Sequence, residues 1–475
     1  MKIIGRHSEK EKLQKCLDSE KAEFIAVFGR RRVGKTFLIK EFFKNDFTFY
    51  ISGLANATKK EQIENFNYAL NIYGKSRYYQ SKSWLESFRQ LANLLESSRK
   101  KGKKIVFIDE ISWFDTARSD FLKGIELFWN GWASCRSDVI LILCGSTNSW
   151  IIKKLLNNWG GLYNRVTQRI PIQPFNLSEC EEYFEYKKIK FEKKSILDSY
   201  MIFGGIPYYL NLFEKELSLA QNVDKLCFMK NSELQNEFST LYSSLFKNSK
   251  HHESVIKALA RKRMGLTREE IKKETKLQGG GLTTILEELE QCDFISSFKC
   301  YKKKSKERLY QLIDFFSLFY LNFIKNKHQD EERFWVNIID NAKHRDWSNY
   351  AFQQVCILHY EQIKRKLGIS GVATKLASWR SKNPDHNTKI DFLFERKDGI
   401  IHLCEMRYCG MEYLIDKKME KILRDKKYTF MEEMNIRKSV QTTMVSIYGV
   451  ERNEYWSAVQ SEIKIKDLFV NINNE

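Results

Sequence analysis

Residues 24–36 read FIAVFGRRRVGKT, an apolar run that ends in a glycine-rich, basic loop. The last eight residues match G-x-x-x-x-G-K-[ST], the pattern of a loop whose backbone N–H groups surround phosphates. Residues 37–43, FLIKEFF, follow with apolar side chains at helical spacing. A helix that starts there points its N-terminus at the bound anion. The stretch therefore predicts a strand, a phosphate-binding loop and a helix, rather than a chance match in an ordinary turn.

The residue types in this loop fit separate tasks at a nucleotide. Gly29 and Gly34 let the backbone approach the phosphates closely. Lys35 has the length to reach the β- and γ-phosphates, and Thr36 offers its hydroxyl to Mg²⁺. The predicted nucleotide-binding residues are Gly29, Arg30, Arg31, Arg32, Val33, Gly34, Lys35, Thr36 and Phe37.

A second predicted strand ends in two carboxylates. Residues 103–110, KKIVFIDE, are a basic lead into an apolar run that ends in Asp109 and Glu110. In open α/β sheets, ligands bind beyond the carboxyl ends of the strands. Asp109 is therefore expected beside Thr36, where it orders Mg²⁺ through a water, and Glu110 is expected to orient or activate the attacking water. The alternative is that the two carboxylates only cap a helix.

Two more predicted strands carry polar residues at their ends. Ser146 follows residues 138–144, and is predicted either to sense the γ-phosphate or to cap the next helix. Arg165 precedes residues 167–173, on the ligand side of the sheet. It is predicted either to stabilise transition-state charge in a neighbouring subunit of a homo-oligomer or to be a plain surface arginine.

Length and composition limit the classes of protein that fit. A chain of 475 residues predicts two to four domains. Its formal charge of +20 indicates a polyanionic partner such as DNA, or else lysines spread over solvated faces. Ten scattered cysteines at no zinc-binding spacing predict free thiols in a reducing compartment. The early charges at the N-terminus and the short apolar run at 315–324 predict a cytoplasmic protein without a membrane partner.

Residues 176–245 have helical periodicity that is interrupted by Gly204-Gly205-Ile206-Pro207. A Gly-Gly-x-Pro sequence inside helical sequence forces a local turn. We expect this turn either to close over the nucleotide or merely to join two helices.

Residues 246–325 predict three helices followed by two strands, which is the pattern of a winged helix. The outward helix carries Thr283 and Thr284 near its N-terminus, where a recognition helix meets base edges. Between the two strands lies a basic tip that is expected to meet phosphates. This tip contains Lys302, Lys303, Lys304 and Lys306.

The same outward helix also carries Glu287, Glu288 and Glu290. Carboxylates on a recognition helix repel DNA. The alternative for this domain is therefore a winged helix that is used for protein contacts.

Residues 346–475 contain a second group of charged side chains. A predicted hairpin with its tight turn at Asp398 brings Asp391 opposite Glu405, and Arg407 projects from the same face. Two carboxylates on one face can hold a hard cation. Asp followed by Glu-x-basic on the next strand is the skeleton of metal-dependent phosphodiester cleavage. The alternative is a structural cross-strand pair.

Six motifs occur in order along the chain: Ile4-Gly5-Arg6-x-x-Glu9, GRRRVGKT, IVFIDE, CGS, GGLYNR and GGIPYYL. Over nearly its whole length the sequence resembles prokaryotic ATPases of the AAA+/STAND type, the archaeal-ATPase-like group. The resemblance implies an α/β protein with a P-loop NTPase parallel sheet, a helical lid, a winged helix-turn-helix and a C-terminal domain like restriction endonucleases. The implied boundaries are 1–175 for the ATPase core, 176–245 for the lid, 246–325 for the winged helix, 326–345 for a linker and 346–475 for the nuclease-like domain.

The resemblance also implies cofactors and residue roles. ATP and Mg²⁺ would be bound by Lys35, Thr36, Asp109 and Glu110, with a sensor at or near Ser146. Arg165 falls where such families carry an arginine finger. Gly205 and Pro207 fall where the STAND group closes on the base.

The nuclease-like part departs from its family at two positions. Arg407 stands where a lysine is usual, and arginine cannot give up its proton to act as a base. Gln353 stands where the preceding helix often supplies a glutamate, and an amide holds Mg²⁺ less well than a carboxylate. Glu361 or Lys417 could compensate. These departures predict a domain that keeps the nuclease fold, with cleavage left open.

Two functions follow from these features. The first is an ATP-hydrolysing protein that couples its nucleotide state to DNA binding through the winged helix. The second is a non-enzymatic, nucleotide-gated regulator or protein-interaction switch.

Overall fold

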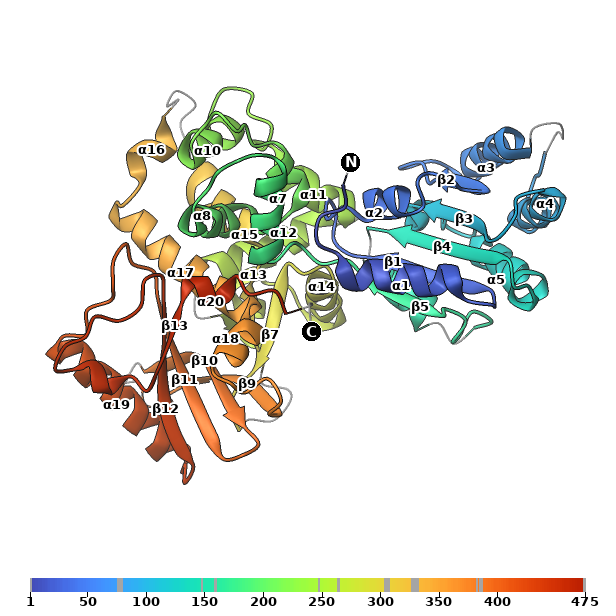
Figure 1. Cartoon of the computed structure of the whole chain (residues 1–475). Helices are drawn as coiled ribbons and strands as arrows, with labels where there is room; N and C mark the ends of the chain where they lie inside the picture. The colour runs from blue at the N-terminus through green and yellow to red at the C-terminus, as the bar shows by residue number, and fades with distance from the viewer. Residues whose placement is uncertain are drawn as a thin grey trace. The chain divides into compact units, whose positions relative to one another are not determined.

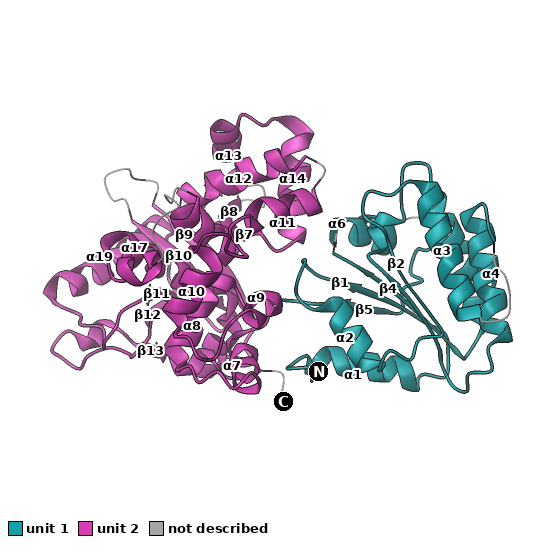
Figure 2. Ribbon diagram, turned by 90° about the horizontal axis from the view of Figure 1, so that it is seen from above, with its two compact units in different colours: residues 1–174 teal, residues 175–475 magenta. Residues whose placement is uncertain are grey.

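The computed structural model describes residues 2–74, 80–146, 148–157, 160–246, 248–262, 265–302, 308–325, 333–381, 383 and 388–472. The chain divides into two compact units, Met1–Pro174 and Phe175–Glu475 (Figure 2). Among the described residues, no helix combines the length and the apolar character that a membrane crossing requires.

Unit 1 is built on a parallel five-stranded sheet in the order β2-β3-β4-β1-β5. Helices cover both faces of this sheet, with α1 and α2 on one side and α3 and α4 on the other (Figure 2). The strands are β1 (Glu23–Phe28), β2 (Phe49–Ser52), β3 (Lys104–Asp109), β4 (Val139–Gly145) and β5 (Gln168–Pro171). The helices are α1 (His7–Asp18), α2 (Lys35–Phe42), α3 (Lys59–Gly74), α4 (Trp84–Ser97), α5 (Phe121–Gly131) and α6 (Asn148–Trp150).

Both faces of the central strands are apolar because both are covered. Every residue of β3 and β4 is buried, which matches the near-continuous apolar runs expected of a parallel sheet. Trp84 of α4 meets Phe66 of α3 and Phe121 of α5 edge-on, with ring centroids 5.6 and 4.8 Å apart. These rings belong to the same core cluster as Phe24 of β1. The aromatic core therefore packs the helices firmly against the sheet.

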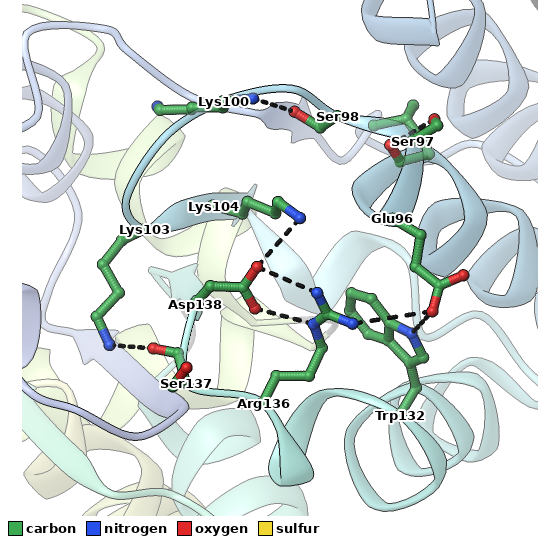
Figure 3. A network of polar contacts seen from close by, with 11 residues as sticks. Glu96, Ser97, Ser98, Lys100, Lys103, Lys104, Trp132, Arg136, Ser137 and Asp138 are labelled. Atoms are coloured by element: carbon green, nitrogen blue, oxygen red, sulfur yellow. Dashed lines mark hydrogen bonds and ion pairs between the residues drawn. The ribbon is translucent and has the colours of Figure 1, made fainter.

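Lys103 and Lys104, at the start of β3, make structural contacts at the amino edge of the sheet, opposite its carboxyl edge (Figure 3). Asp138 accepts a charged contact from Lys104 at 3.1 Å and from Arg136 Nε at 2.9 Å. The hydrogen bond from Arg136, followed by that from Lys104, lowers the pKa of Asp138 to about 2 despite partial burial. Lys103 donates to the Ser137 carbonyl at 2.7 Å. These charges fasten the starts of β3 and β4 to each other and lie away from the phosphate loop.

Unit 2 begins with helices that pack around the Gly-Gly-x-Pro turn. Gly204 ends α8 with φ 65°, and Pro207 starts α9. Gly205 has φ 66°, and a Cβ there would lie 2.1 Å from the Phe175 carbonyl oxygen, so only glycine fits. The turn thus joins two helices. The helices of this part are α7 (Leu177–Tyr186), α8 (Lys193–Phe203), α9 (Pro207–Asn211), α10 (Leu219–Cys227) and α11 (Glu237–Leu245).

The next segment consists of three helices and a small antiparallel sheet in the order β6-β8-β7. A capping box joins Thr267 and Glu270 at the start of α13. The elements are α12 (Ser249–Arg261), β6 (Leu266–Thr267), α13 (Arg268–Thr275), α14 (Gly279–Gln291), β7 (Ile295–Lys299) and β8 (Arg308–Leu312).

The hairpin of β7 and β8 is fastened to the C-terminal sheet at its tip. The Tyr301 backbone N–H donates to the Ser378 carbonyl at 2.9 Å, and the Tyr301 ring is buried in the core around Trp379. Lys302 Nζ donates to the Met434 carbonyl at 2.9 Å. Lys302 is exposed apart from this hydrogen bond, so the expectation that it meets phosphates stays a prediction. Residues 303–306 lie outside the described residues.

The charged segment expected to be a linker, 326–345, contains packed structure in its described part. Trp335 lies in α16 (Phe334–Ile338) and is 3% exposed. Its ring packs edge-on against Phe319 and Trp347. The apolar side chains within this charged stretch find a core, which charge counting alone does not predict. The preceding helical elements are α15 (Phe315–Phe319) and a π-helical turn over Tyr320–Ile324.

The C-terminal sheet is mixed, with the strand order β13-β12-β11-β10-β9. The first three strands along the chain pair antiparallel, and β11, β12 and β13 pair parallel. The strands are β9 (Thr374–Arg380), β10 (Lys389–Arg396), β11 (Ile400–Arg407), β12 (Ser439–Ser446) and β13 (Ser461–Lys464). The helices are α17 (Ala342–Leu358), α18 (Tyr360–Lys366), α19 (Lys417–Glu433) and α20 (Ile465–Leu468) (Figure 1).

A buried histidine connects the first helices of unit 2 with its last third. His359 lies between α17 and α18, and its Nε2 accepts the Leu177 backbone N–H at 3.1 Å. Its Nδ1 lies 2.8 Å from the Val355 carbonyl, so Nδ1 carries the proton and the ring is neutral. Burial lowers the pKa of His359 to about 4. A charged ring would lose the bond to Leu177.

We predict that His359 makes unit 2 less stable in acid. Between pH 6.5 and 4 the unfolded chain binds a proton at this histidine and the folded chain does not. Stability contributed by the neutral ring is therefore lost as pH falls through this window, by up to about 3 kcal/mol. Urea unfolding followed by tryptophan fluorescence at pH 7.5 and pH 4.5 should show a smaller pH effect in His359→Gln. Equal pH effects in both proteins would contradict this.

Candidate functional site

The loop between β1 and α2 has a shape that its glycines impose. A Cβ on Gly29 would lie 2.2 Å from the Ile172 carbonyl oxygen, a distance that no side chain tolerates. Gly34 has φ 88° and directly precedes Lys35, the first residue of α2. The loop therefore turns tightly and directs the N-terminus of α2 toward its own interior.

Lys35 lies at the centre of this loop. Its Nζ donates to the carbonyls of Gly29 at 2.9 Å and Arg30 at 2.8 Å, and the side chain is buried. Arg30 is also buried, Arg31 and Arg32 are half-buried, and Phe37 is exposed. The ammonium is thus held inside a ring of backbone, where a phosphate oxygen could replace a carbonyl as its partner.

Thr36 and Asp109 come together as the sequence predicts. Thr36 Oγ1 donates to Asp109 Oδ2 at 2.7 Å, and Asp109 Oδ1 accepts the Glu110 backbone N–H at 2.9 Å. Asp109 is buried at the carboxyl end of β3. A hydroxyl and a carboxylate at this spacing are the oxygen ligands that Mg²⁺ takes, so the donor set fits this ion.

Glu110 and Ser146 also meet. Ser146 Oγ donates to Glu110 Oε1 at 2.8 Å, so this serine contacts a predicted catalytic group. Glu110 has φ 46° and ψ 46°, a left-handed backbone conformation that costs a non-glycine residue about 1 kcal/mol. Glu110 follows directly on β3, at the carboxyl edge of the sheet.

The interior beside this site disfavours further negative charge. Cys144 is buried at the end of β4, and burial raises the pKa of its thiol well above the usual value, with Asp109 adding to the rise. Cys144 therefore stays a neutral thiol next to Asp109.

One residue that supports the loop was given no role in the sequence analysis. Arg6 donates from Nη2 to the Val33 carbonyl at 3.2 Å, and its Nη1 lies 3.6 Å from Glu9 Oε1. The Arg6 side chain is 6% exposed. The Arg-x-x-Glu spacing at the start of α1 is the signal that would have identified this pair. Arg6 is a positioning residue, since it acts on the loop backbone.

Other predicted residues lie apart from this group. Arg165 is exposed in the loop before β5, and its backbone N–H donates to the Leu162 carbonyl at 3.1 Å. Gly205 and Pro207 belong to unit 2, so their assignment to the base stays a prediction. Thr147, which follows Ser146, lies outside the described residues.

In unit 2, the predicted carboxylates of the C-terminal sheet are paired with cations. Phe392 pairs with Cys404, so Asp391 and Glu405 are the next residues along the two paired strands. Glu405 Oε1 lies 2.6 Å from Arg407, and Oε2 lies 2.5 Å from Lys426 of α19. Asp391 contacts Lys389 at 2.9 Å. Lys426 was missed in the sequence analysis because only folding brings α19 over β11.

These pairs decide the electrostatics of the second group. Burial raises the pKa of Glu405, but Lys426 and then Arg407 outweigh it, so the pKa lies below its usual value. Within the described part of the chain, no three His, Cys, Asp or Glu side chains gather as a metal site. Gln353 lies in α17. A divalent cation would have to displace an ion pair, so the residues fit Mg²⁺ poorly here.

The outward helix α14 carries less exposed negative charge than its sequence suggests. Glu288 Oε2 lies 3.0 Å from His252 Nε2, and Glu290 Oε1 accepts from Ser297 Oγ at 2.5 Å. Of the three glutamates only Glu287 is exposed, next to exposed Thr283 and Thr284. At the start of the helix, a Cβ on any of Gly279, Gly280 or Gly281 would meet no atom within 4 Å.

Comparison with known families identifies the first part of the chain. Residues 4–213 match the family model described as an ATPase domain predominantly from Archaea. This part of the chain is similar to that ATPase domain. This match covers the phosphate loop, both carboxylates at the end of β3, Ser146 and Arg165.

Similar proteins extend the comparison beyond this domain. The uncharacterized protein MJECL04 of Methanocaldococcus jannaschii is 25% identical over 432 residues, which cover 89% of this chain and 90% of that protein. The uncharacterized ATP-binding protein MJ0423 of the same organism is 48% identical over 43 residues, which cover 9% of this chain and 73% of that protein.

A solved structure shares the fold. The Walker-type ATPase PABY2304 of Pyrococcus abyssi aligns with a TM-score of 0.50 and 19% identity, over 67% of this chain and 96% of its own. The chain therefore shares the α/β fold of this solved structure.

We predict that Gly29→Ala impairs the phosphate loop. The added methyl group would collide with the Ile172 carbonyl, so the loop must move away from β5. Affinity for a fluorescent ATP analogue should fall at least about tenfold, which corresponds to about 1.4 kcal/mol. Gly131→Ala in α5 is the control, because its nearest contact is 3.9 Å from the new Cβ. Wild-type affinity in Gly29→Ala would contradict this reading of the loop.

Proposed function

We propose that this protein is a Mg²⁺-dependent ATPase whose nucleotide state controls its binding to DNA. One observation carries the first half of the proposal: Thr36, Asp109, Glu110 and Ser146 form two linked pairs at the carboxyl edge of the sheet, with Lys35 held inside the phosphate loop.

Each residue of this group has a task in the proposal. The loop N–H groups and Lys35 bind the β- and γ-phosphates. Thr36 and Asp109 would hold Mg²⁺, which supplies charge neutralisation at the phosphates when bound. Glu110 orients the attacking water and accepts its proton, and Ser146 fixes the direction of the Glu110 carboxylate. Arg6 keeps the loop in shape through Val33.

Arg165 extends the proposal to an assembly. Its exposure supports a task outside its own subunit. In a homo-oligomer this guanidinium would stabilise the charge on the γ-phosphate of a neighbouring copy.

Two substitutions separate nucleotide binding from hydrolysis. Lys35→Ala should abolish both, because the phosphates lose their cation. Glu110→Gln should keep binding and lower phosphate release by a factor of about 100 or more, because an amide does not accept the proton. Ser146→Ala should lower turnover less and leave affinity unchanged. Phosphate release and titration with a fluorescent ATP analogue measure the two properties. Unchanged turnover in both Lys35→Ala and Glu110→Gln would refute the ATPase.

DNA binding is assigned to the segment from α12 to β8, as a winged helix. Its three helices and β-hairpin support this assignment, with α14 as the recognition helix. Glu288 and Glu290 are hydrogen-bonded to His252 and Ser297, which leaves Glu287 as the exposed glutamate of the three on α14. The glycines at the start of α14 leave room for a duplex to approach the backbone.

We predict that negative charge on the exposed face of α14 weakens duplex binding. The double variant Thr283→Glu/Thr284→Glu should lower affinity for a 20-base-pair duplex at least about tenfold, through repulsion of phosphates. Ser239→Glu/Ser243→Glu adds the same charge to exposed positions of α11 and is the matched control. Fluorescence anisotropy at fixed salt measures both. An equal fall in affinity in the two double variants would mean that only total charge matters.

The C-terminal sheet is proposed to be nuclease-like in fold and to hold nucleic acid without cutting it. The ion pairs on both oxygens of Glu405, together with Gln353 and Arg407, favour this version over cleavage. They also keep the second candidate function, a non-enzymatic nucleotide-gated switch, as the alternative. Incubation with plasmid, ATP and Mg²⁺ separates the versions, because a nick that disappears in Asp391→Ala would establish cleavage. The five-part division of the chain is likewise a proposal.

A further inference from the structure

We propose that the outer face of α19 is a second DNA-binding surface, which contacts the phosphate backbone of a duplex. This inference rests on the proposed DNA binding but not on the winged helix or on cleavage. Helix α19 lies over the C-terminal sheet, and runs from Lys417 to Glu433 (Figure 1). Its inner face buries Met419, Leu423 and Phe430 against the cores on either side.

The outer face carries a stripe of basic and aromatic side chains. Lys417, Lys421, Arg424 and Tyr428 follow one another at spacings of four, three and four residues, which keeps them on one side of a helix. All four are exposed, and the Tyr428 ring is 61% exposed. The stripe spans roughly 16 Å at 1.5 Å per residue. That length matches about five base pairs of duplex at 3.4 Å each.

Basic residues outnumber acidic residues in the first three turns of this helix. Residues 417–428 contain six basic and two acidic side chains. Arg424 pairs with Glu420 at 3.3 Å, Lys426 pairs with Glu405, and Asp425 remains as an exposed carboxylate. Among the described residues, no ion pair engages the other four basic side chains. These are Lys417, Lys418, Lys421 and Lys427.

Three lysines elsewhere in the chain are instead engaged within the protein. Lys104 is committed to an ion pair, and Lys103 and Lys302 donate to backbone carbonyls. The ammonium groups of exposed Lys417 and Lys421 instead face solvent together, where each can neutralise one phosphate and release a counterion. An exposed tyrosine beside them adds a ring and a hydroxyl that can contact sugar and phosphate.

Duplex DNA fits this face better than a membrane does. A helix that binds a lipid surface inserts its apolar side, and the apolar side of α19 is already packed on the sheet. The inner side of the same helix contributes Lys426 to the ion pair with Glu405, so this lysine is not part of the stripe. Phosphate contacts position a protein without reading sequence. We therefore assign sequence-independent holding of the duplex to α19.

The test measures how duplex affinity depends on salt in the full-length protein. Removal of one lysine–phosphate contact should reduce the slope of log K against log[salt] by about 0.9. We expect Lys417→Ala/Lys421→Ala to reduce the slope by about 2 and to lower affinity equally for unrelated duplex sequences. The matched control is Lys375→Ala/Lys397→Ala, which removes two exposed lysines, one from β9 and one from the turn between β10 and β11. The control should keep the wild-type slope. Circular dichroism checks that both variants are folded.

Four results would overturn the inference. Equal slopes for wild type and the α19 variant would rule out the phosphate contacts, even if Thr283→Glu/Thr284→Glu still weakens binding. Equal reductions in the α19 and control variants would assign the effect to total charge. Binding to vesicles of phosphatidylserine that disappears in the α19 variant, with an unchanged duplex slope, would assign the face to membranes. A wild-type protein without any duplex binding would instead refute the proposed function as well.

Discussion

The close approach of Gly29 to the Ile172 carbonyl is the constraint from which the site in unit 1 follows. It forces the chain to leave β1 in a tight turn, and that turn encloses Lys35 and brings Thr36 within 2.7 Å of Asp109. The parallel sheet brings the other site residues together, because the carboxyl ends of β1, β3 and β4 lie at one edge. Arg6 and Ser146 then hold the loop and the Glu110 carboxylate from two further elements.

The formal charge of +20 separates, in the structure, into groups with different tasks. Lys104 and Arg136 neutralise Asp138 at the amino edge of the first sheet, and Lys302 is tied to the carbonyl of Met434. Charges that are engaged within the protein in this way are no evidence for a polyanionic partner. Lys417 and Lys421 of α19 are exposed and enter no ion pair within the described ranges, so their charge remains available to phosphates.

Unit 2 is held together by contacts that cross its expected domain boundaries. Tyr301, at the tip of the β7–β8 hairpin, is buried beside Trp379 of the C-terminal sheet, and Trp335 fills a core between helices on both sides of the expected linker. His359 ties the start of α7 to α17. These contacts join the helices, the hairpin and the C-terminal sheet of unit 2 into one compact body.

The amino-acid sequence alone determined the phosphate loop, the carboxylate strand and the order of elements, because these depend on local patterns: apolar periodicity, fixed glycine spacing and capping boxes. The turn length also predicts a hairpin register, and the pairing of Phe392 with Cys404 has that register. Only the tertiary structure decided which charges meet. Ser146 reaches Glu110, Arg6 reaches Val33, and Lys426 reaches Glu405 from segments 36, 27 and 21 residues away. Ion pairs and hydrogen bonds act over a few ångströms in space, so a side chain's partner depends on how the elements pack.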